Sequence, residues 1–493
     1  MYLLDNNFII DVLANRKGYK DKYFDIIIYC LENSMACICV NQIDRLRYVI
    51  KKEYKDIYDN YLLLEKKLKI IKTPSCVDLE SQLAIIDIED YMIELSARGV
   101  NAKIITSDKK FLALSTLTIT PNDFYGVEEK KSIKIDFANL KKQYFMYQSE
   151  LEQEIDKVLK NTSYIMGEAV KSLEKNLENF TKAKYAITCS SGTDALLLAM
   201  MALDIEPDDE IITTPFTFIA TAETIAFLGA KPIFVDIDEK TYNIDSTKIE
   251  AKITSKTKAI MPVSLYGQPA NMEKIQAIAT KHNLKVIIDG AQSFGSTFNG
   301  VSDSNLGDIS TTSFFPAKPL GCFGDGGAVF TNNEALATKI KSLRVHGQSK
   351  RYHHQYIGMG GRMDTLQCAI VNVKLKYYAK DLALRQEVAS KYNKALEGKD
   401  IILPFVEKNN TSAFAQYSIR VKNRDEVQTR LKEKGIPTAV HYPMPLHLQE
   451  CFTYLGHQKG DFPIAELISD EILSLPMNPY ITDEEIAYIG KNI

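Results

Sequence analysis

The pattern of hydrophobic and polar residues divides the chain into two segments. In residues 1–125, short apolar runs that we interpret as strands alternate with helical runs. These runs lie at 2–4, 8–14, 26–31, 36–40 and 42–52, with a further strand at 104–106. A charged stretch at 128–132 follows a turn signal at 121–123 and is typical of a linker. We therefore predict a small α/β domain at 1–127 and a linker at 128–136.

From about residue 134 the pattern becomes longer and more regular. Strands are expected at 185–188, 210–214, 232–235, 259–263 and 285–288, with helices at 193–203, 219–228, 246–251 and 271–282. A long helical segment at 363–377 then leads into a mixed region. Strands that alternate with helices of this length predict a mainly parallel sheet covered on both faces. We expect a large α/β domain at 137–375 and a smaller C-terminal domain at 376–493.

Composition and charge exclude several classes of protein. The 493 residues are 45% hydrophobic and 25% charged, which is typical of a globular protein of more than one domain. A net charge of −3 gives no basis for a nucleic-acid or membrane partner. The eight cysteines form no CxxC pair and no Cys/His cluster, and the long, cytosolic-looking chain suggests that they are reduced. Because the N-terminus lacks a basic, apolar leader and no run reaches membrane-spanning length, we expect a cytoplasmic protein.

One lysine and one aspartate carry the clearest chemical signal. Lys318 lies between an apolar strand end and a glycine-containing turn, where burial can remove its proton and let it form a Schiff base with an aldehyde. Asp289 ends the apolar run 285–288. A carboxylate in that position can hold a pyridine nitrogen protonated, as pyridoxal phosphate requires. Together the two residues predict a pyridoxal phosphate site.

Further candidates lie at the ends of neighbouring predicted strands. Gly192 and Thr193 open a helix, whose first N–H groups can bind a phosphate together with the hydroxyl of Ser313. Phe218 follows the next strand and can stack on a cofactor ring, and Gln292 can hydrogen-bond the ring hydroxyl. Ligands of open α/β sheets collect at the carboxyl ends of strands. These residues are therefore expected to converge on one site.

Residues 134–493 resemble the DegT/DnrJ/EryC1/StrS sugar aminotransferases, which are fold-type I pyridoxal phosphate enzymes. The matching stretches are SSGTDAL (190–196), FTFIATA (216–222), VIIDGAQ (286–292), SFFPAK (313–318), GDGG (324–327), RMDTLQ (362–367) and HY (441–442). The resemblance implies a mainly parallel seven-stranded sheet, a smaller C-terminal α+β domain, and a homodimer with shared active sites. Gly360 departs from the pattern, because asparagine is common at this position in the family.

The resemblance also implies a role for each site residue. Lys318 corresponds to the lysine that bonds to the cofactor and acts as general base, and Asp289 to the partner of the pyridinium. The other implied cofactor contacts are Gly192, Thr193, Phe218, Gln292 and Ser313. The implied substrate contacts are Arg362, His441 and Tyr442, with Arg362 reaching across the dimer interface. A planar guanidinium suits a uronate or a diphosphate.

Four further stretches concern the substrate. VSLYGQ (263–268), KPLGCFGDGG (318–327), PTAVHYPMPL (437–446) and SLPMNPY (474–480) resemble family members that aminate UDP-2-acetamido-2-deoxy-3-oxo-glucuronate for surface polysaccharide synthesis, with glutamate as the amino donor. Sister enzymes that act on other 3- or 4-keto nucleotide sugars share most of these motifs. Their substrates stay open as alternatives.

Acidic residues recur beside apolar runs in the first segment. Asp5, Asp44, Asp90 and Asp108 are candidate ligands for Mg²⁺ or Mn²⁺, which clustered carboxylates can bind to activate water. The stretches LLDNNFIIDVL (3–13), DIED (87–90) and TSDKKF (106–111) resemble a PIN domain, a metal-dependent ribonuclease fold. The segment then has either RNA as a partner or a tethering role.

Two alternatives to an aminotransferase remain from the sequence. The chain could be a nuclease whose C-terminal part only binds a ligand, which predicts Mg²⁺-dependent RNA cleavage and no cofactor absorbance. It could also be a related pyridoxal phosphate enzyme that dehydrates sugars. The presence of Lys318 argues against the second alternative, because the dehydratase relatives have histidine there.

Overall fold

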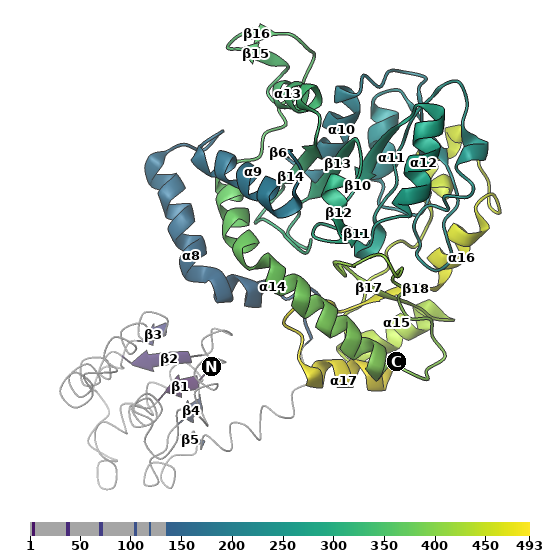
Figure 1. The fold of residues 1–493 in the computed structure, drawn as a ribbon. Helices are drawn as coiled ribbons and strands as arrows, with labels where there is room; N and C mark the ends of the chain where they lie inside the picture. Colours follow the sequence, from purple (N-terminus) through teal and green to yellow (C-terminus); the bar gives the residue numbers. More distant parts are fainter. Residues whose placement is uncertain (1, 5–35, 40–68, 72–102, 106–117, 120–134) are drawn as a thin grey trace, which may run out of the picture. The chain divides into compact units, whose positions relative to one another are not determined.

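The computed structural model describes residues 2–4, 36–39, 69–71, 103–105, 118–119 and 135–493. The chain divides into two compact units, residues 1–132 and 133–493 (Figure 1). Each unit is described by itself.

The described part of the first unit is a five-stranded sheet. Its strands are β1 (Tyr2–Leu4), β2 (Ala36–Cys39), β3 (Lys69–Ile71), β4 (Lys103–Ile105) and β5 (Thr118–Ile119). The strand order is β3-β2-β1-β4-β5, and every neighbouring pair is parallel. The order reverses direction between β1 and β4, so their carboxyl ends flank the switch point of the sheet.

A seven-stranded sheet forms the centre of the second unit. Its strands are β6 (Tyr185–Cys189), β7 (Glu210–Thr213), β8 (Lys231–Phe234), β9 (Thr257–Ile260), β10 (Lys285–Asp289), β13 (Ile309–Ser313) and β14 (Gly327–Thr331). The order is β6-β14-β13-β10-β9-β7-β8. Only β14 runs antiparallel to its neighbours. The expectation of a mainly parallel seven-stranded sheet is confirmed.

Both faces of this sheet are buried, which explains the apolar runs in most of its strands. Successive residues of one strand enter different cores: Ile211 packs in the cluster formed with α10, α11 and α13, and Ile212 packs in the cluster formed with α12. Ala186 packs against α9 and α14, and Ile187 lies on the opposite face. The sheet is therefore the middle of three layers (Figure 1).

The helices of the second unit are arranged along the sheet and beyond it. They are α8 (Leu140–Asn161), α9 (Glu168–Thr181), α10 (Gly192–Ala202), α11 (Ala220–Phe227), α12 (Met272–His282), α13 (Glu334–Leu343), α14 (Thr365–Ala395), α15 (Arg424–Glu433), α16 (Pro463–Glu471) and α17 (Asp483–Asn492). The helix expected at 363–377 is α14, which continues without a break to Ala395. The domain boundary expected at 375 thus falls inside this helix.

The C-terminal part packs around the second half of α14. It contains the antiparallel pair β17 (Tyr417–Arg420) and β18 (Ile472–Leu475) together with α15, α16 and α17. Tyr392 of α14 stacks on Tyr417 with ring centroids 4.7 Å apart. Short antiparallel hairpins, β11 (Thr297–Phe298) with β12 (Val301–Ser302) and β15 (Gln348–Lys350) with β16 (His353–His354), complete the described strands.

The prediction of a helix at 246–251 is wrong. The chain forms only a 3-10 turn, η3 (Glu250–Lys252), in this region. The carboxylate of Asp245 accepts hydrogen bonds from the backbone N–H and the hydroxyl of Thr247, at 3.0 and 2.6 Å. Such local side-chain bonds compete with a helix and favour a turn.

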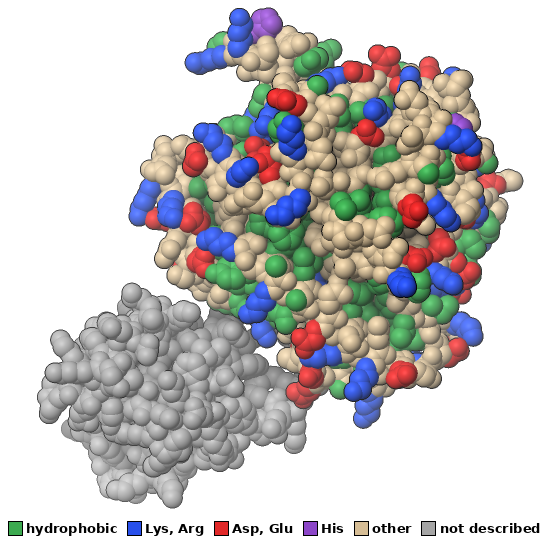
Figure 2. Space-filling view, in the orientation of Figure 1, with side chains coloured by type: hydrophobic (Ala, Val, Ile, Leu, Met, Phe, Trp, Pro, Cys, Tyr) green, Lys and Arg blue, Asp and Glu red, His purple; other side chains and the backbone are tan. Residues whose placement is uncertain are grey.

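The surface of the second unit carries charges of both signs. On the face shown in Figure 2, lysine and arginine side chains are interspersed with aspartate and glutamate. This face therefore has no broad basic patch of the kind that binds nucleic acid. Among the described residues, no helix is both long enough and apolar enough to cross a membrane.

Candidate active site

A cavity of about 500 Å³ lies at the carboxyl edge of the seven-stranded sheet. Its walls come from the start of α10, from the loops after β7, β10 and β13, and from two segments of the C-terminal part around 416 and 441–442. It contains nine of the ten cofactor and substrate residues expected from the sequence: Gly192, Thr193, Phe218, Asp289, Gln292, Ser313, Lys318, His441 and Tyr442. Residues from segments far apart in the sequence thus meet in one cavity.

Lys318 lies in the turn that follows β13. Its backbone N–H donates to the carbonyl of Phe315 at 2.9 Å, and its half-buried side chain enters the cavity. Burial lowers the pKa of Lys318, and the negative charge of Asp289 opposes this shift. The amine therefore loses its proton more readily than a solvated lysine, as a nucleophilic amine requires.

Asp289 is the last residue of β10 and is only 5% exposed. Its carboxylate accepts hydrogen bonds from the Thr221 hydroxyl at 2.7 Å and from the Ala291 N–H at 3.2 Å. Burial raises the pKa of Asp289 in spite of these bonds and of the nearby Lys318. A cationic group in the cavity would stabilise the carboxylate, so the site fits a protonated pyridine nitrogen.

The start of α10 forms the part of the cavity suited to an anion. The Ser191 hydroxyl caps the helix by accepting from the Asp194 N–H at 3.0 Å, and Gly192 opens the first turn. A Cβ at Gly192 would lie 2.7 Å from the Cβ of Ser313, so only glycine fits this close approach. The free N–H groups of the turn and the hydroxyls of Thr193 and Ser313 fit a phosphate group.

Gln292, Tyr442 and Phe218 also line the cavity. The Gln292 side-chain amide donates to the Tyr442 hydroxyl at 3.1 Å. The ring of Phe218 is 54% exposed and lies 6.1 Å from the ring of Tyr442, between centroids. An exposed aromatic ring on a cavity wall is available to stack on a planar ligand.

The imidazole of His441 is held in place by a hydrogen bond within the C-terminal part. Its Nδ1 is 2.9 Å from the hydroxyl of Ser474, the partner strand residue of Ser418. Burial, with a smaller contribution from the charge of Lys318, lowers the pKa of His441 to about 4. The imidazole is therefore uncharged at neutral pH.

Arg362 is the expected site residue that does not line this cavity. It lies just before α14 and is half-buried, and its guanidinium forms no salt bridge or hydrogen bond within the described part of the chain. A Cβ at Gly360 would lie 3.8 Å from the Arg362 Nη2.

The sequence prediction missed several residues of the cavity. Thr221 hydrogen-bonds both Asp289 and the hydroxyl of Thr217, the latter at 2.9 Å. Asp325 and Gln416 also line the cavity. Threonines at 217, 221 and 224 in an otherwise apolar stretch were a signal, because polar groups at helical spacing in a buried segment need partners.

The expected metal ligands Asp5, Asp44, Asp90 and Asp108 lie outside the described residues. In the part of the chain that the structure describes, no group of three or more His, Cys, Asp or Glu side chains is placed to hold a metal ion. The metal site stays a prediction.

The three-layer fold and the lysine–aspartate pair at the carboxyl edge of its sheet define a fold-type I pyridoxal phosphate-dependent aminotransferase. A model of the DegT/DnrJ/EryC1/StrS aminotransferase family matches residues 146–493. The chain belongs to this family.

Relatives match the second unit over nearly their whole length. A Pseudomonas aeruginosa protein named UDP-2-acetamido-2-deoxy-3-oxo-D-glucuronate aminotransferase is 48% identical over 355 residues, covering 72% of this chain and 98% of that protein. An Acidithiobacillus ferrooxidans protein named as a UDP-N-acetyl-3-dehydro-alpha-D-glucosamine 3-aminotransferase is 40% identical over 356 residues, covering 72% and 96%. The structure of NtdA from Bacillus subtilis with bound cofactor PMP is 28% identical, covering 77% of this chain and 93% of that one, with a TM-score of 0.69.

Proposed function

We propose that this protein uses pyridoxal phosphate to transfer an amino group from glutamate to the keto group of a nucleotide sugar. The first candidate substrate is UDP-2-acetamido-2-deoxy-3-oxo-glucuronate, on which the Pseudomonas aeruginosa relative is named to act. The observation that carries the proposal is the pair of opposite pKa shifts in one cavity, where the pKa of Lys318 is lowered and that of Asp289 is raised. Groups with such shifts in a cavity mark catalytic sites.

The described residues fit each part of the cofactor. The first turn of α10, with Gly192, Thr193 and Ser313, would hold the phosphate, and Asp289 would hold a proton on the ring nitrogen. When bound, pyridoxal phosphate supplies an aldehyde for a covalent link to amines and a ring that withdraws electrons. Lys318 would bond to the aldehyde through Nζ.

Once displaced by the amino donor, Lys318 would act as general base. Its Nζ would take a proton from the carbon that bears the amino group of glutamate. It would later return a proton to the sugar carbon that receives the nitrogen. A lowered lysine pKa brings the amine closer to the operating pH for both transfers.

A second copy of the chain would complete the site. Phe315 lines the cavity and is 52% exposed, and the neighbouring Phe323 is 42% exposed. Large apolar side chains exposed on a surface are typical of a region that another chain covers. Arg362, with its guanidinium unpaired among the described residues, would bind the uronate or diphosphate in the partner's cavity.

The substrate is tested by a choice between two sugars that differ at one carbon. The purified protein is incubated with glutamate and with UDP-2-acetamido-2-deoxy-3-oxo-glucuronate or the corresponding 3-keto-glucosamine nucleotide, and the amino sugar is detected by mass spectrometry. We expect kcat/KM to favour the uronate, because an arginine near the sugar rewards a carboxylate. Equal turnover of the two, or a preference for the uncharged sugar, contradicts a uronate site. If the uronate is the substrate, its amino sugar product would serve surface polysaccharide synthesis.

For the first unit we propose a metal-dependent nuclease site of the PIN type. The supporting observation is the sheet order β3-β2-β1-β4-β5, all parallel, with its switch point between β1 and β4. Asp5 directly follows β1 in the sequence, and Asp108 follows β4 by three residues. Ligand sites of such sheets lie at the carboxyl ends that flank the switch point. Mg²⁺-dependent cleavage of single-stranded RNA that Asp5→Asn abolishes supports this site, and equal cleavage by the variant contradicts it.

A further inference from the structure

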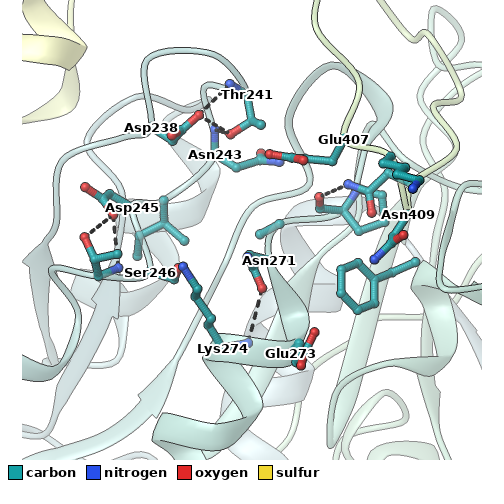
Figure 3. A pocket seen from close by; sticks show the side chains of 17 residues that line it. Asp238, Thr241, Asn243, Asp245, Ser246, Asn271, Glu273, Lys274, Glu407 and Asn409 are labelled. Carbon is teal, nitrogen blue, oxygen red and sulfur yellow. Dashed lines mark hydrogen bonds between the residues drawn. The ribbon is translucent and has the colours of Figure 1, made fainter.

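One turn is hydrogen-bonded to residues that line two different cavities. This turn, η4 (Leu265–Gly267), follows Val263, which lines the active-site cavity. The second cavity, of about 250 Å³, is lined by Asn243 on one side and by Asn271, the N-cap of α12, and Lys274 of that helix on another (Figure 3). Gln292, which accepts from the Tyr266 N–H, lines the first cavity, and Asn243, which accepts from the Leu265 N–H, lines the second.

Tyr266 in this turn has an unusual backbone. Its φ is +56°, in the left-handed region, although it is a buried, bulky residue. The next residue, Gly267, has φ +120°, and a Cβ there would lie 2.6 Å from the backbone nitrogen of Phe414. A non-glycine residue in this region costs conformational free energy, so the surrounding contacts must hold it there.

Two groups of Tyr266 reach the two halves of the active site. Its backbone N–H donates to the Oε1 of Gln292 at 2.7 Å, which leaves the Gln292 amide N–H facing Tyr442. Its hydroxyl donates to the backbone carbonyl of His441. One residue thus contacts the glutamine on the cofactor side and the histidine on the substrate side.

Asn243 holds the same turn from behind. Its Oδ1 accepts from the N–H of Leu265 at 2.9 Å, and its Nδ2 donates to the carbonyl of Gln268 at 3.1 Å. Asn243 is 2% exposed, so both bonds are shielded from water. A buried amide with both ends satisfied fixes the geometry of the backbone that it bridges.

We propose that Tyr266 is a positioning residue that aligns Gln292 and His441 through separate bonds, and that Asn243 keeps its turn in the required conformation. The inference rests on the proposed function for the roles of Gln292 and His441. The hydroxyl of Tyr266 acts on the substrate side. The backbone N–H, held by Asn243, acts on the cofactor side.

The test uses one variant for each bond. Tyr266→Phe removes only the hydroxyl, and we expect the KM for the nucleotide sugar to rise about fivefold to tenfold. The absorbance spectrum of the bound cofactor and its pH titration should stay as in the wild type. Asn243→Ala frees the turn, and we expect the dissociation constant of pyridoxal phosphate to rise about tenfold, with a shifted absorbance titration.

Two further variants serve as controls. Tyr242→Phe removes a hydroxyl from a buried tyrosine whose ring lies 5.8 Å from that of Tyr266. It should leave both the KM for the nucleotide sugar and the dissociation constant of pyridoxal phosphate unchanged. Asn243→Asp keeps the acceptor for the Leu265 N–H and loses the donor to the Gln268 carbonyl. Its dissociation constant for pyridoxal phosphate should therefore lie between those of Asn243→Ala and the wild type. This variant also replaces Asn243→Ala if that protein does not fold.

Specific outcomes overturn the inference. The inference is wrong if Tyr266→Phe has the KM of the wild type and the Asn243 variants have its cofactor titration. The turn then does not position Gln292 and His441. Parallel changes of both readouts in every variant, in step with a lower Tm, indicate a merely structural role and also exclude it. The cofactor readouts need no sugar, so the Asn243 variants decide the cofactor side of the inference even if the nucleotide sugars prove not to be substrates.

Discussion

The active-site cavity and the second cavity of the same unit differ in how their polar groups are compensated. The second cavity is lined by more carboxylates, Asp238, Asp245, Glu273 and Glu407 (Figure 3). Burial acts to raise the pKa of Asp245, but hydrogen bonds from Thr247 and Lys248 outweigh it and lower that pKa. In the active-site cavity, burial outweighs the hydrogen bonds and raises the pKa of Asp289.

The comparison shows that polarity alone does not mark a catalytic site. Asp245 is satisfied by the turn around it, so its charge contributes to the fold. Asp289 is held in a position where the protein does not fully stabilise its charge, and a cationic ligand would do so. The two lysines differ in their exposure to solvent. Lys318 is partly desolvated beside a carboxylate, whereas Lys274 is exposed.

The largest contrast is expected between the two lysines. Lys318→Ala removes the nucleophile and proton carrier, so transaminase turnover should fall roughly 10⁴-fold or more. Lys274→Ala should change kcat/KM by less than about twofold, because surface charges away from the chemistry contribute little. Turnover of both variants is measured by mass spectrometry of the amino sugar. Retained turnover in Lys318→Ala would falsify the assigned role.

The two aspartates should separate activity from stability. Asp289→Asn should lower kcat roughly 10²- to 10³-fold, because a neutral amide cannot hold the ring nitrogen protonated. It should not lower the free energy of unfolding of the cofactor-free protein, since it removes an ionisable group whose charge is disfavoured by burial.

Asp245→Asn should show the opposite result. It weakens the bonds to Thr247 and Lys248 and should lower the free energy of unfolding by about 1 kcal/mol, with activity unchanged. Urea denaturation and steady-state kinetics measure both quantities. If Asp245→Asn lost activity while Asp289→Asn kept it, the comparison between the cavities would fail.

A smaller effect is expected at the phosphate end. In Gly192→Ala the new Cβ would lie 2.7 Å from the Cβ of Ser313, so the helix start or the serine must move. The dissociation constant of pyridoxal phosphate should rise at least about tenfold, which corresponds to 1.4 kcal/mol. As a control, Gly324→Ala places its Cβ 3.2 Å from the flexible end of Gln367 and should keep the affinity within about twofold. Fluorescence titration of the apo-protein gives both constants.

The last effect concerns His441 and the dependence of stability on pH. Its pKa is lowered to about 4 in the folded protein, so the unfolded chain binds more protons between about pH 4 and 6.5. Stability of the cofactor-free protein should therefore fall as the pH decreases through this window. Between pH 7 and pH 5 the contribution of His441 should be about 1–2 kcal/mol, and His441→Gln should remove it. Urea denaturation at the two pH values tests this, and an unchanged pH dependence in the variant would contradict it.

Much of the site could be predicted because parallel strands bring their carboxyl ends together. Asp289 is the last residue of β10, and Lys318 lies just beyond β13, so the sequence order of apolar runs already placed them at one edge. The phosphate end was also predictable, since a glycine followed by a helix signal after a strand has one common geometry.

Other features depend on contacts that no local pattern contains. The left-handed turn at Tyr266 is held by Asn243 and by the backbone N–H groups of Ala413 and Ala415, which are distant in the sequence. The expected helix at 246–251 was lost to a side-chain bond of Asp245, and α14 runs on past its predicted end because the C-terminal part packs around it. The placement of Arg362 outside the cavity likewise depends on tertiary packing.

The most direct test of the account is where the cofactor becomes attached. The purified protein is incubated with pyridoxal phosphate, reduced with borohydride, digested and mapped by mass spectrometry. We predict that the pyridoxyl group is found on the peptide that contains Lys318 and that Lys274 stays unlabelled. A label on Lys274 or another surface lysine, with none on Lys318, would contradict the assignment of the active site to the cavity at the carboxyl edge of the sheet.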